Sequence, residues 1–472
     1  MMRTANVIGS GPNGLAAAIT LAERGVAVTV YERNASAGGA CATGELTLPG
    51  FQHDLGSSVY PLGVVSPFFR SLPLQKYGLR WIQPPAALAH PLDDGSAAML
   101  ERSLDQTAQQ FDAHDARNWH LLFSPTVRDW DAVVDGVTHP LLSVPQHPVQ
   151  MANFGAAALL PAEFLARTCF KSPAARALFA GCAAHSVVPL SKLGSAAVAL
   201  VLGTAGCTTG WPIVAGGAQS LTSALVAHLE ALGGRVELGI TVRSIEELPQ
   251  ADATFFDTSV ESLLRIAGKA LSPEYEARAR RFKSGPGIFK VDWALREPIP
   301  WKNAACARAA TVHLGGTLEE IAGSERDAFY GRHNARPFVL LVQPALFDTT
   351  RAPSGQHTAW AYCHVPTGSD VDMTEVIEAQ VERFAPGFRE VVLARRAWGS
   401  TSLAAWNANL ATGDVSGGAM TLGQMVLRPT AKTYRTSNPR VFLCSASTPP
   451  GGGVHGMCGY LAATTALRTL HR

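Results

Sequence analysis

Charged side chains are scarce in this chain of 472 residues. Asp, Glu, Lys and Arg make up 16% of it and leave a formal net charge of +2, whereas globular domains carry about 25% charged residues. No basic run is present, so the electrostatic footprint of a nucleic-acid-binding protein is missing. We therefore expect a well-buried globular protein of two or three domains, or of one large composite domain, without a nucleic-acid partner.

The sequence also lacks an uncharged apolar run of about 20 residues, the length needed to cross a membrane. The first residues read as a strand and a turn instead of a signal peptide, so we expect a cytoplasmic protein. Two shorter segments, residues 154–170 and 195–206, are strongly apolar. The first best fits a buried helix, and the alternatives are the wall of an apolar pocket and a surface that docks on a bilayer. Peripheral contact with a membrane therefore stays open.

Paired cysteines are missing too. None of the eight cysteines forms a CxxC motif or a zinc-finger cluster with histidine, so we expect no metal site and a reducing compartment. A flavin disulfide reductase needs a second cysteine a few residues after Cys41, but the next one is Cys169. A dithiol mechanism is therefore disfavoured, and we interpret Cys41 as a small packed residue near a cofactor.

The clearest motif lies at the start of the chain. A short apolar strand, a glycine-rich turn, an Ala/Leu-rich helix and a second apolar strand follow one another over residues 5–31. Gly9, Gly11 and Gly14 fill the GxGxxG positions, and Glu32 closes the second strand. The glycines permit a tight turn, the approach of a pyrophosphate to the backbone and close packing of helix on strand, and the acid accepts from ribose hydroxyls. The pattern predicts a dinucleotide site that favours a free ribose 2′-hydroxyl.

The rest of the chain divides by pattern. Residues 67–205 read as mostly helical, and two short strands are predicted at 235–238 and 241–245. Residues 285–400 alternate β-rich runs with loops, which predicts a mixed or antiparallel sheet. Residues 439–470 read as a strand, a Gly/Pro loop and a helix. A second helix N-terminus aimed at the same ligand suits a cofactor with another polar end.

These segments resemble FAD-dependent oxidoreductases of the phytoene desaturase-like family, which share a superfamily with the amine oxidases. The likeness runs from end to end and is strongest to bacterial phytoene dehydrogenase-related proteins and to pyridine nucleotide-disulfide oxidoreductase-like members. It is carried by VIGSGPNGLAAAITLAERGVAVTVYERNASAGGAC, GFQHDLGSS, GGAQSLTSALVAHLEALGGRVELGITVRSI, GDVSGGAM and RVFLCSASTPPGGGVHGMCGYLAA.

The resemblance implies an α/β fold with a Rossmann-like FAD-binding domain of the glutathione reductase type. This domain is discontinuous, with residues 1–70, 208–262 and 396–472. An inserted α+β substrate domain has a helical part at 71–207 and a mixed sheet at 263–395.

The resemblance also implies the contacts of the cofactor FAD. The glycine turn takes the pyrophosphate, Glu32 the adenosine ribose, Val242 the adenine, and the C-terminal loop the flavin ring. Family members often carry Arg at the position of Ala40, so here phosphate neutralisation depends on backbone N–H groups, the helix dipole or another cation such as Arg33. The full set is Gly9, Gly11, Pro12, Asn13, Gly14, Glu32, Arg33, Gly38, Gly39, Ala40, Gly56, Ser57, Val242, Ser445, Gly452, Gly453, Val454 and Gly456.

Candidates for proton transfer are few. Desaturation requires removal of a proton beside the carbon that loses hydride. His455 in the flavin loop and Asp414 in the adjacent GDVSGG turn are the predicted catalytic residues, and each equally fits a structural role as a cap. His53 and Asp54 follow the glycine pair, and Asp54 reads as a backbone brace.

Our main hypothesis is an FAD-dependent dehydrogenase or desaturase. Its substrate is an apolar isoprenoid, carotenoid or lipid-like molecule. The sequence does not specify the electron acceptor, for which O2, a quinone and another carrier all stay open. One alternative is a flavin amine oxidase, for which Trp398, Trp406 and Tyr460 offer aromatic rings. Another is a non-catalytic flavoprotein with an interaction role. A nicotinamide dehydrogenase leaves the C-terminal glycine loop unexplained, and the oligomeric state is not predicted.

Overall fold

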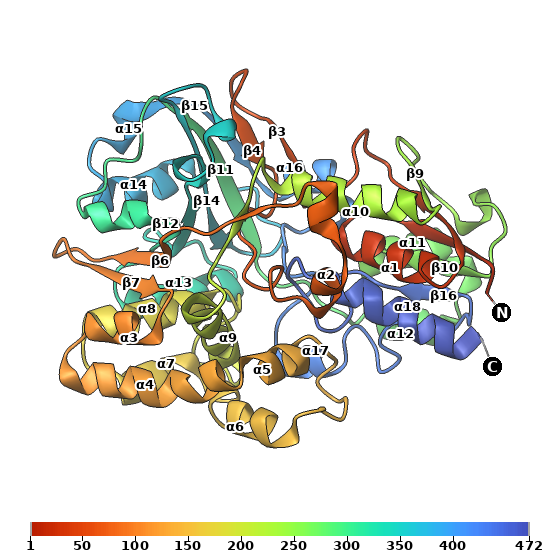
Figure 1. Cartoon of the computed structure of the whole chain (residues 1–472), viewed down its shortest axis with the longest axis horizontal. Helices are drawn as coiled ribbons and strands as arrows, with labels where there is room; N and C mark the ends of the chain where they lie inside the picture. The colour runs from red at the N-terminus through yellow and green to blue at the C-terminus, as the bar shows by residue number, and fades with distance from the viewer. Residues whose placement is uncertain (1, 471–472) are drawn as a thin grey trace.

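The computed structural model describes residues 2–470 and contains two lobes, each built on a β-sheet (Figure 1). The first lobe holds a parallel five-stranded sheet in the order β16-β10-β1-β2-β9. Its strands come from three distant parts of the chain: β1 (Thr4–Ile8), β2 (Ala27–Tyr31), β9 (Arg235–Glu237), β10 (Ala253–Phe256) and β16 (Val441–Leu443). The first and the last strand of the chain, β1 and β16, therefore lie in this lobe.

Helices cover both faces of the five-stranded sheet. One face shares a buried apolar core with α1 (Pro12–Ala22), α10 (Ala218–Ala231) and α18 (Met457–Leu470). The other face shares a second core with α11 (Val260–Ala267) and α12 (Pro273–Ala279). Helix α18 lies so close to α1 that a Cβ on Gly459 would stand 1.8 Å from the carbonyl oxygen of Asn13. The C-terminal helix is thereby fixed against the N-terminal dinucleotide turn.

The second lobe holds a mixed seven-stranded sheet. Its order is β15-β11-β14-β13-β12-β6-β7, and only the β12–β6 pair is parallel. The strands are β6 (Ala86–Pro91), β7 (Ala97–Glu101), β11 (Gly287–Leu295), β12 (Ala309–Leu314), β13 (Val339–Val342), β14 (His357–Val365) and β15 (Val392–Trp398). Helix α14 (Thr374–Phe384) and the short α15 (Phe388–Val391) share a buried apolar core with one face.

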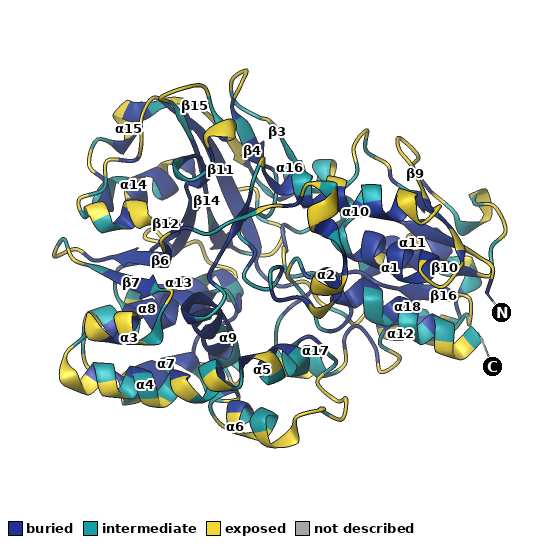
Figure 2. Cartoon of the chain, viewed as in Figure 1, coloured by how far each residue is buried: buried dark blue, intermediate teal, exposed yellow. Residues whose placement is uncertain are grey.

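A layer of helices covers the opposite face of this sheet and shares a second buried apolar core with it. It consists of α3 (Leu104–Gln109), α4 (Ala113–Arg128), α5 (Trp130–Val137), α6 (Pro148–Ala158), α7 (Ala162–Cys169), α8 (Pro173–Ala184), α9 (Ser195–Cys207) and α13 (Leu318–Phe329). Figure 2 shows α9 buried along its length, whereas α4 and α6 expose one side. The apolar segment 195–206 is thus a buried helix, and segment 154–170 belongs to the partly exposed α6 and α7.

Short elements complete the description: β3 (Thr43–Glu45), β4 (Gln52–Asp54), β5 (Trp81–Ile82), β8 (Ile213–Val214), α2 (Pro67–Ser71), α16 (Ser400–Trp406) and α17 (Leu422–Val426). Among residues 2–470, no helix combines the length and the hydropathy needed to cross a membrane.

The predicted fold class is confirmed, but two local predictions are wrong. Residues 86–101 form the hairpin β6–β7, not a helix, because pairing with β12 overrides an Ala-rich sequence without β-branched residues. The strand predicted at 241–245 does not form, because the Ser244 hydroxyl accepts from Glu246 N–H and starts a 3₁₀ turn. The division into domains stays a prediction. The two sheets draw their strands from the expected parts of the chain, except for β6 and β7 and for β15, which crosses the predicted boundary at residue 395.

Candidate active site

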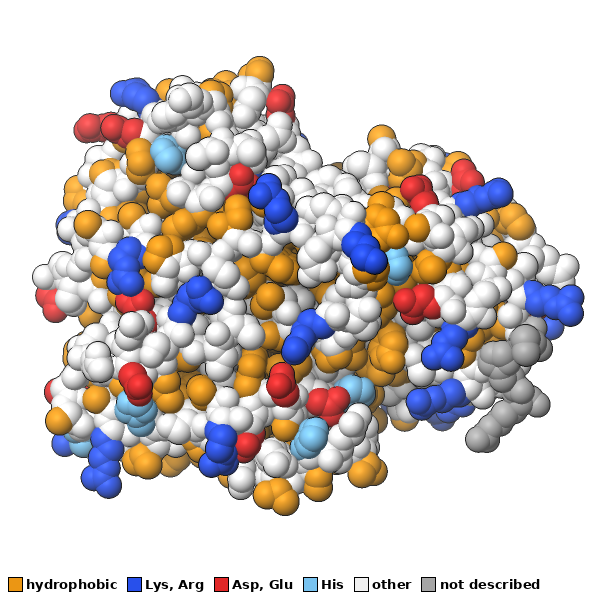
Figure 3. Space-filling model, in the orientation of Figure 1, with side chains coloured by type: hydrophobic (Ala, Val, Ile, Leu, Met, Phe, Trp, Pro, Cys, Tyr) orange, Lys and Arg blue, Asp and Glu red, His pale blue; other side chains and the backbone are white. Residues whose placement is uncertain are grey.

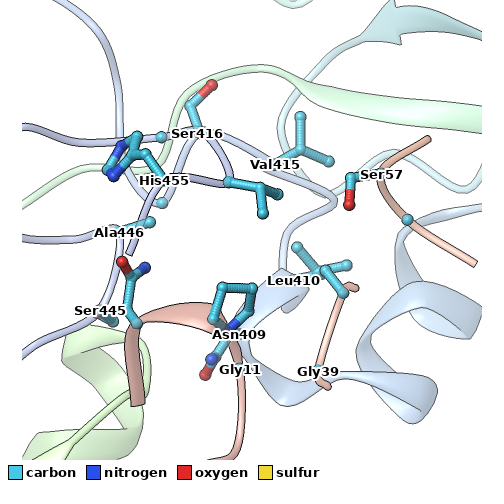
Figure 4. Close-up of a pocket in the computed structure, with 18 of the residues that line it drawn as sticks. Gly11, Gly39, Ser57, Asn409, Leu410, Val415, Ser416, Ser445, Ala446 and His455 are labelled. Atoms are coloured by element: carbon cyan, nitrogen blue, oxygen red, sulfur yellow. The ribbon is translucent and has the colours of Figure 1, made fainter. Parts of the chain in front are cut away.

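A cavity of about 730 Å³ lies between the two lobes. The space-filling view shows hydrophobic side chains in the hollow between them (Figure 3). The close-up shows Gly11 and Gly39 on one side of an open space and Ser445, Ala446 and His455 on another (Figure 4). The N-terminal turn and the C-terminal loop therefore face one site, as the sequence led us to expect.

The glycine turn builds the first wall of the cavity. A Cβ on Gly14 would lie 2.1 Å from the carbonyl oxygen of Gly9, so only glycine fits there. Helix α1 begins directly after Gly11 without a side-chain cap. Its first N–H groups have no partner within the helix, and its N-terminus carries a partial positive charge. This end of the cavity is consequently suited to a phosphate.

Glu32 is held rigidly at the carboxyl end of β2. Its Oε2 accepts from the hydroxyl of Ser10 at 2.7 Å and from the backbone N–H of Ser10 at 3.1 Å, and its Oε1 accepts from Asn34 N–H at 2.9 Å. The carboxylate lines the cavity and is 5% exposed. Since a carboxylate offers about four acceptor positions, one remains for a ribose hydroxyl.

Asp257 is a site residue that the sequence analysis missed. It follows β10, next to β1, and its Oδ2 accepts from Gly14 N–H at 2.8 Å. Burial raises the pKa of this carboxyl to about 7, and the nearby charge of Glu32 acts in the same direction. An acid at the carboxyl end of a strand beside the dinucleotide turn was the available signal.

Most predicted cofactor residues meet at the cavity. Gly14, Gly38 and Gly456 are not among the lining residues. Cys41 is also buried outside the lining, where burial raises the pKa of its thiol to about 11. The predicted residues that line the cavity are Gly9, Gly11, Pro12, Asn13, Glu32, Arg33, Gly39, Ala40, Gly56, Ser57, Val242, Ser445, Gly452, Gly453 and Val454.

His455 and Asp414 both have structural partners. The Nδ1 of His455 accepts from Met457 N–H at 3.1 Å at the start of α18, and burial lowers the pKa of its imidazole to about 4. The carboxylate of Asp414 accepts from the backbone N–H groups of Gly285, Ser416 and Gly418. Both side chains thus fix the loops around the cavity, and a catalytic role for either stays a prediction.

Two arginines flank these loops. Arg33 lines the cavity, but its Nη2 donates to the carbonyls of Ala405 and Trp406 at the end of α16. Arg428 was not predicted; it is fully buried and donates to carbonyls on both C-terminal loops, at Ser416 and Ala446 among others. Arg428 therefore holds the two loops together through charge-assisted hydrogen bonds.

The cavity has two halves: a dinucleotide half, lined by the glycine turn and the C-terminal loop, and a second half, lined by the seven-stranded sheet and its helices. A buried ion pair lies at the junction between them. On β11 the Lys290 ammonium donates to Asp292 at 2.5 and 2.6 Å and to the carbonyl of Asp54 at 3.1 Å. Burial lowers the pKa of Lys290, and Asp292 opposes that shift. Lys290 lines the cavity 5.1 Å from the ring of Trp360. A lysine and an aspartate two residues apart in an apolar strand were the missed signal, because they share one face.

Asp54 braces the backbone as predicted from its position. It accepts from Ala218 N–H at 2.8 Å and pairs with the buried Arg351 at 2.8 Å. Burial and the nearby cations Lys290 and Arg351 lower the pKa of His53 to about 3.

The second half of the cavity is apolar. One face of the seven-stranded sheet contributes Tyr362, Leu340, Trp360, Val342 and Thr311 from β14, β13 and β12. Helices α5, α6 and α9 add Val137, Met151, Phe154, Val198, Val201 and Leu202. Within residues 2–470, no Asp or Glu contributes to the lining of this half.

Two of the three aromatic residues proposed for an amine oxidase lie together, since the rings of Trp398 and Trp406 are tilted toward each other with centroids 6.1 Å apart. Trp398 is buried and donates from Nε1 to Asp292 at 2.9 Å, and Tyr460 packs on Phe68. Trp406 lines the cavity. The aromatic pair that faces the cavity is instead Trp360 and Tyr362, whose rings stack with centroids 5.9 Å apart.

Comparison with known proteins agrees with this geometry. Residues 7–72 match the family model for an NAD(P)-binding Rossmann-like domain. The pyridine nucleotide-disulfide oxidoreductase domain-containing protein 2 of Rattus norvegicus is 25% identical, over 98% of this chain and 93% of its own. The 1-hydroxycarotenoid 3,4-desaturase of a Flavobacterium species is 34% identical over 24% of this chain and 23% of its own.

A solved structure extends the likeness to the whole fold. An engineered triple variant of putrescine oxidase has a TM-score of 0.64 at 15% identity, covering 100% of this chain and 99% of its own.

Proposed function

Because the chain belongs to the superfamily of FAD-dependent oxidoreductases that includes carotenoid desaturases and amine oxidases, we propose that it is a dehydrogenase or desaturase. An apolar substrate of isoprenoid or lipid type would give hydride to FAD and lose a proton from the adjacent carbon to the solvent. The observation that carries this proposal is the apolar half of the cavity, which opens directly onto the dinucleotide half and has no acidic lining residue within residues 2–470.

The residues of the dinucleotide half fit FAD, the cofactor of this superfamily. The uncapped start of α1 would hold the pyrophosphate, Glu32 would accept from the ribose, and the C-terminal loop would contact the ring system. When bound, FAD supplies a two-electron acceptor for hydride. Helix α18 starts directly behind the C-terminal loop, so its partial positive charge stabilises negative charge that develops there.

Lys290 has the position to act on the substrate side. Its Nζ lies at the junction of the two halves, where Asp292 and the carbonyl of Asp54 orient it.

Amine oxidation is less well supported. An ammonium substrate requires a carboxylate or an aromatic cage, whereas the apolar half presents the cation Lys290. The stacked rings of Trp360 and Tyr362 leave no space between them for an amine.

Anaerobic reduction of the FAD-loaded protein tests the proposal. We expect limonene, geraniol or a carotenoid to bleach the visible flavin band, and putrescine to leave it unchanged. Bleaching by putrescine with peroxide release would favour an amine oxidase. A flavin that dithionite reduces but no isoprenoid or lipid does would favour a non-catalytic role, and a protein that retains no FAD would refute the proposal.

A further inference from the structure

We propose that His185 and Thr311 form a polar end to the apolar half of the cavity, where they bind one hydroxyl or carbonyl oxygen of an otherwise apolar substrate. This inference rests on the proposed function and deepens it, since it specifies the chemistry of the substrate end that lies farthest from the flavin.

His185 ends α8 and lines the cavity. Its Nε2 lies 2.9 Å from Nε2 of His313 on β12, so one ring donates to the other. His313 is fully buried, and its Nδ1 has no hydrogen-bond partner. The Nδ1 of His185 makes no hydrogen bond within residues 2–470 either, but it is not fully buried. It is therefore accessible from the cavity that His185 lines.

The tautomers of His185 and His313 follow from their unpaired Nδ1 atoms. An unpaired buried N–H costs more than an unpaired lone pair, so His313 carries its proton on Nε2 and donates to His185. The proton of His185 is then on Nδ1. His185 therefore presents an N–H donor to the cavity, and a substrate oxygen is the acceptor that matches it.

The backbone next to His185 is strained. Val187 also lines the cavity, and its φ is 53°. A β-branched residue in the left-handed region is a conformational outlier, and such strain persists where the surrounding structure holds a functional geometry. The tight turn after α8 directs both His185 and Val187 to the cavity.

Thr311 supplies a second polar atom on the same sheet face as His313. It is 2% exposed and lines the cavity, and its hydroxyl has no hydrogen-bond partner among residues 2–470. Strand register places Thr311 opposite Val342, Val342 opposite Trp360, and Trp360 opposite Asp292. Three strand spacings separate β12 from β11, which is about 14 Å. A substrate that reaches from Lys290 to Thr311 therefore has a long apolar body with one polar end.

The neutral ring of His185 determines which polar group of the substrate binds there. Burial lowers the pKa of His185 to about 3, so its ring is uncharged at neutral pH and offers no charge to a carboxylate or a phosphate. A hydroxyl or a carbonyl oxygen accepts from Nδ1–H without ionisation.

Two C10 isoprenoids, the alcohol geraniol and the hydrocarbon myrcene, test this inference by titration into the FAD-loaded protein. Dissociation constants come from the perturbed flavin spectrum and from the shift in thermal midpoint. We expect geraniol to bind about tenfold more tightly than myrcene. His185→Phe should remove that preference and leave the affinity for myrcene unchanged. Thr311→Val should reduce the preference about threefold, and His185→Gln, which keeps a donor, should retain part of it.

His357→Phe and Thr358→Val are matched controls on β14, because neither residue lines the cavity. Both should keep the wild-type preference. Equal binding of the two probes by the wild type would refute the polar end while the apolar cavity of the proposed function stands. Equal weakening of both probes by His185→Phe and His185→Gln would also refute it, since His185 would then only pack. If neither probe binds and no isoprenoid reduces the flavin, the proposed function fails as well.

Discussion

Replacing Asp257 by Asn should make the protein less sensitive to rising pH. Asp257 is 7% exposed and accepts a hydrogen bond from Gly14 N–H. The amide oxygen of Asn keeps that bond but carries no charge. The variant therefore isolates the cost of placing a carboxylate behind the dinucleotide turn.

The magnitude follows from the pKa of Asp257, which burial raises from 3.8 to about 7. In the unfolded chain the group loses its proton near pH 4, whereas in the folded protein it keeps the proton until about pH 7. The unfolded state therefore binds fewer protons between these values, and stability falls as pH rises through this window. The total corresponds to about 4 kcal/mol, because one pKa unit is equivalent to 1.36 kcal/mol.

Urea unfolding between pH 4 and pH 8, at equal FAD saturation, measures this effect. The difference in free energy of unfolding between Asp257→Asn and the wild type should shift in favour of the variant by up to about 4 kcal/mol as the pH rises from 4 to 7. Above pH 7 this difference should change little. Asp131→Asn is the control, because this carboxylate is exposed and its removal should leave the pH profile unchanged. A constant difference between Asp257→Asn and the wild type at every pH would refute the reasoning.

Three further predictions concern the cofactor turn and the buried charges. Gly14→Ala should abolish retention of FAD, because its Cβ would lie 2.1 Å from a carbonyl oxygen, whereas Gly155→Ala meets nothing within 4 Å and should keep the wild-type ratio of flavin to protein absorbance. Arg428→Met should lower the free energy of unfolding by about 3 kcal/mol in urea, since it leaves buried carbonyls unpaired; an unchanged urea midpoint would contradict its role. Lys290→Met should cost about 3–5 kcal/mol by isolating the carboxylate of Asp292, and Lys290→Met/Asp292→Asn should recover most of it; no recovery in the double variant would mean that packing dominates.

Local chemistry allowed much of the fold to be predicted. The glycine spacing, the helix after it and the acid that closes β2 predicted the dinucleotide turn, because only a few neighbouring residues decide that geometry. The C-terminal strand, loop and helix were recognisable for the same reason. The hairpin β6–β7 escaped prediction because its strands are Ala-rich and gain their structure from a partner more than 200 residues away in the chain, β12.

The substrate side of the cavity shows the other limit. Lys290 and Asp292 carried a weak signal, and His185 and Thr311 carried none, because a histidine after a helix or a threonine in a strand is ordinary. Their significance comes from the register of four strands and from the turn after α8, which bring them to one cavity.

By itself, then, the sequence predicted a dinucleotide turn and a second strand–loop–helix unit, because these depend on short-range backbone geometry, and the resemblance to a known family implied FAD. Only the tertiary structure decided which polar groups face the substrate, which loops His455, Asp414 and Arg428 fix in place, and how far burial moves the pKa of Asp257. These properties depend on long-range packing and on the exclusion of water, and neither can be read from the order of residues along the chain.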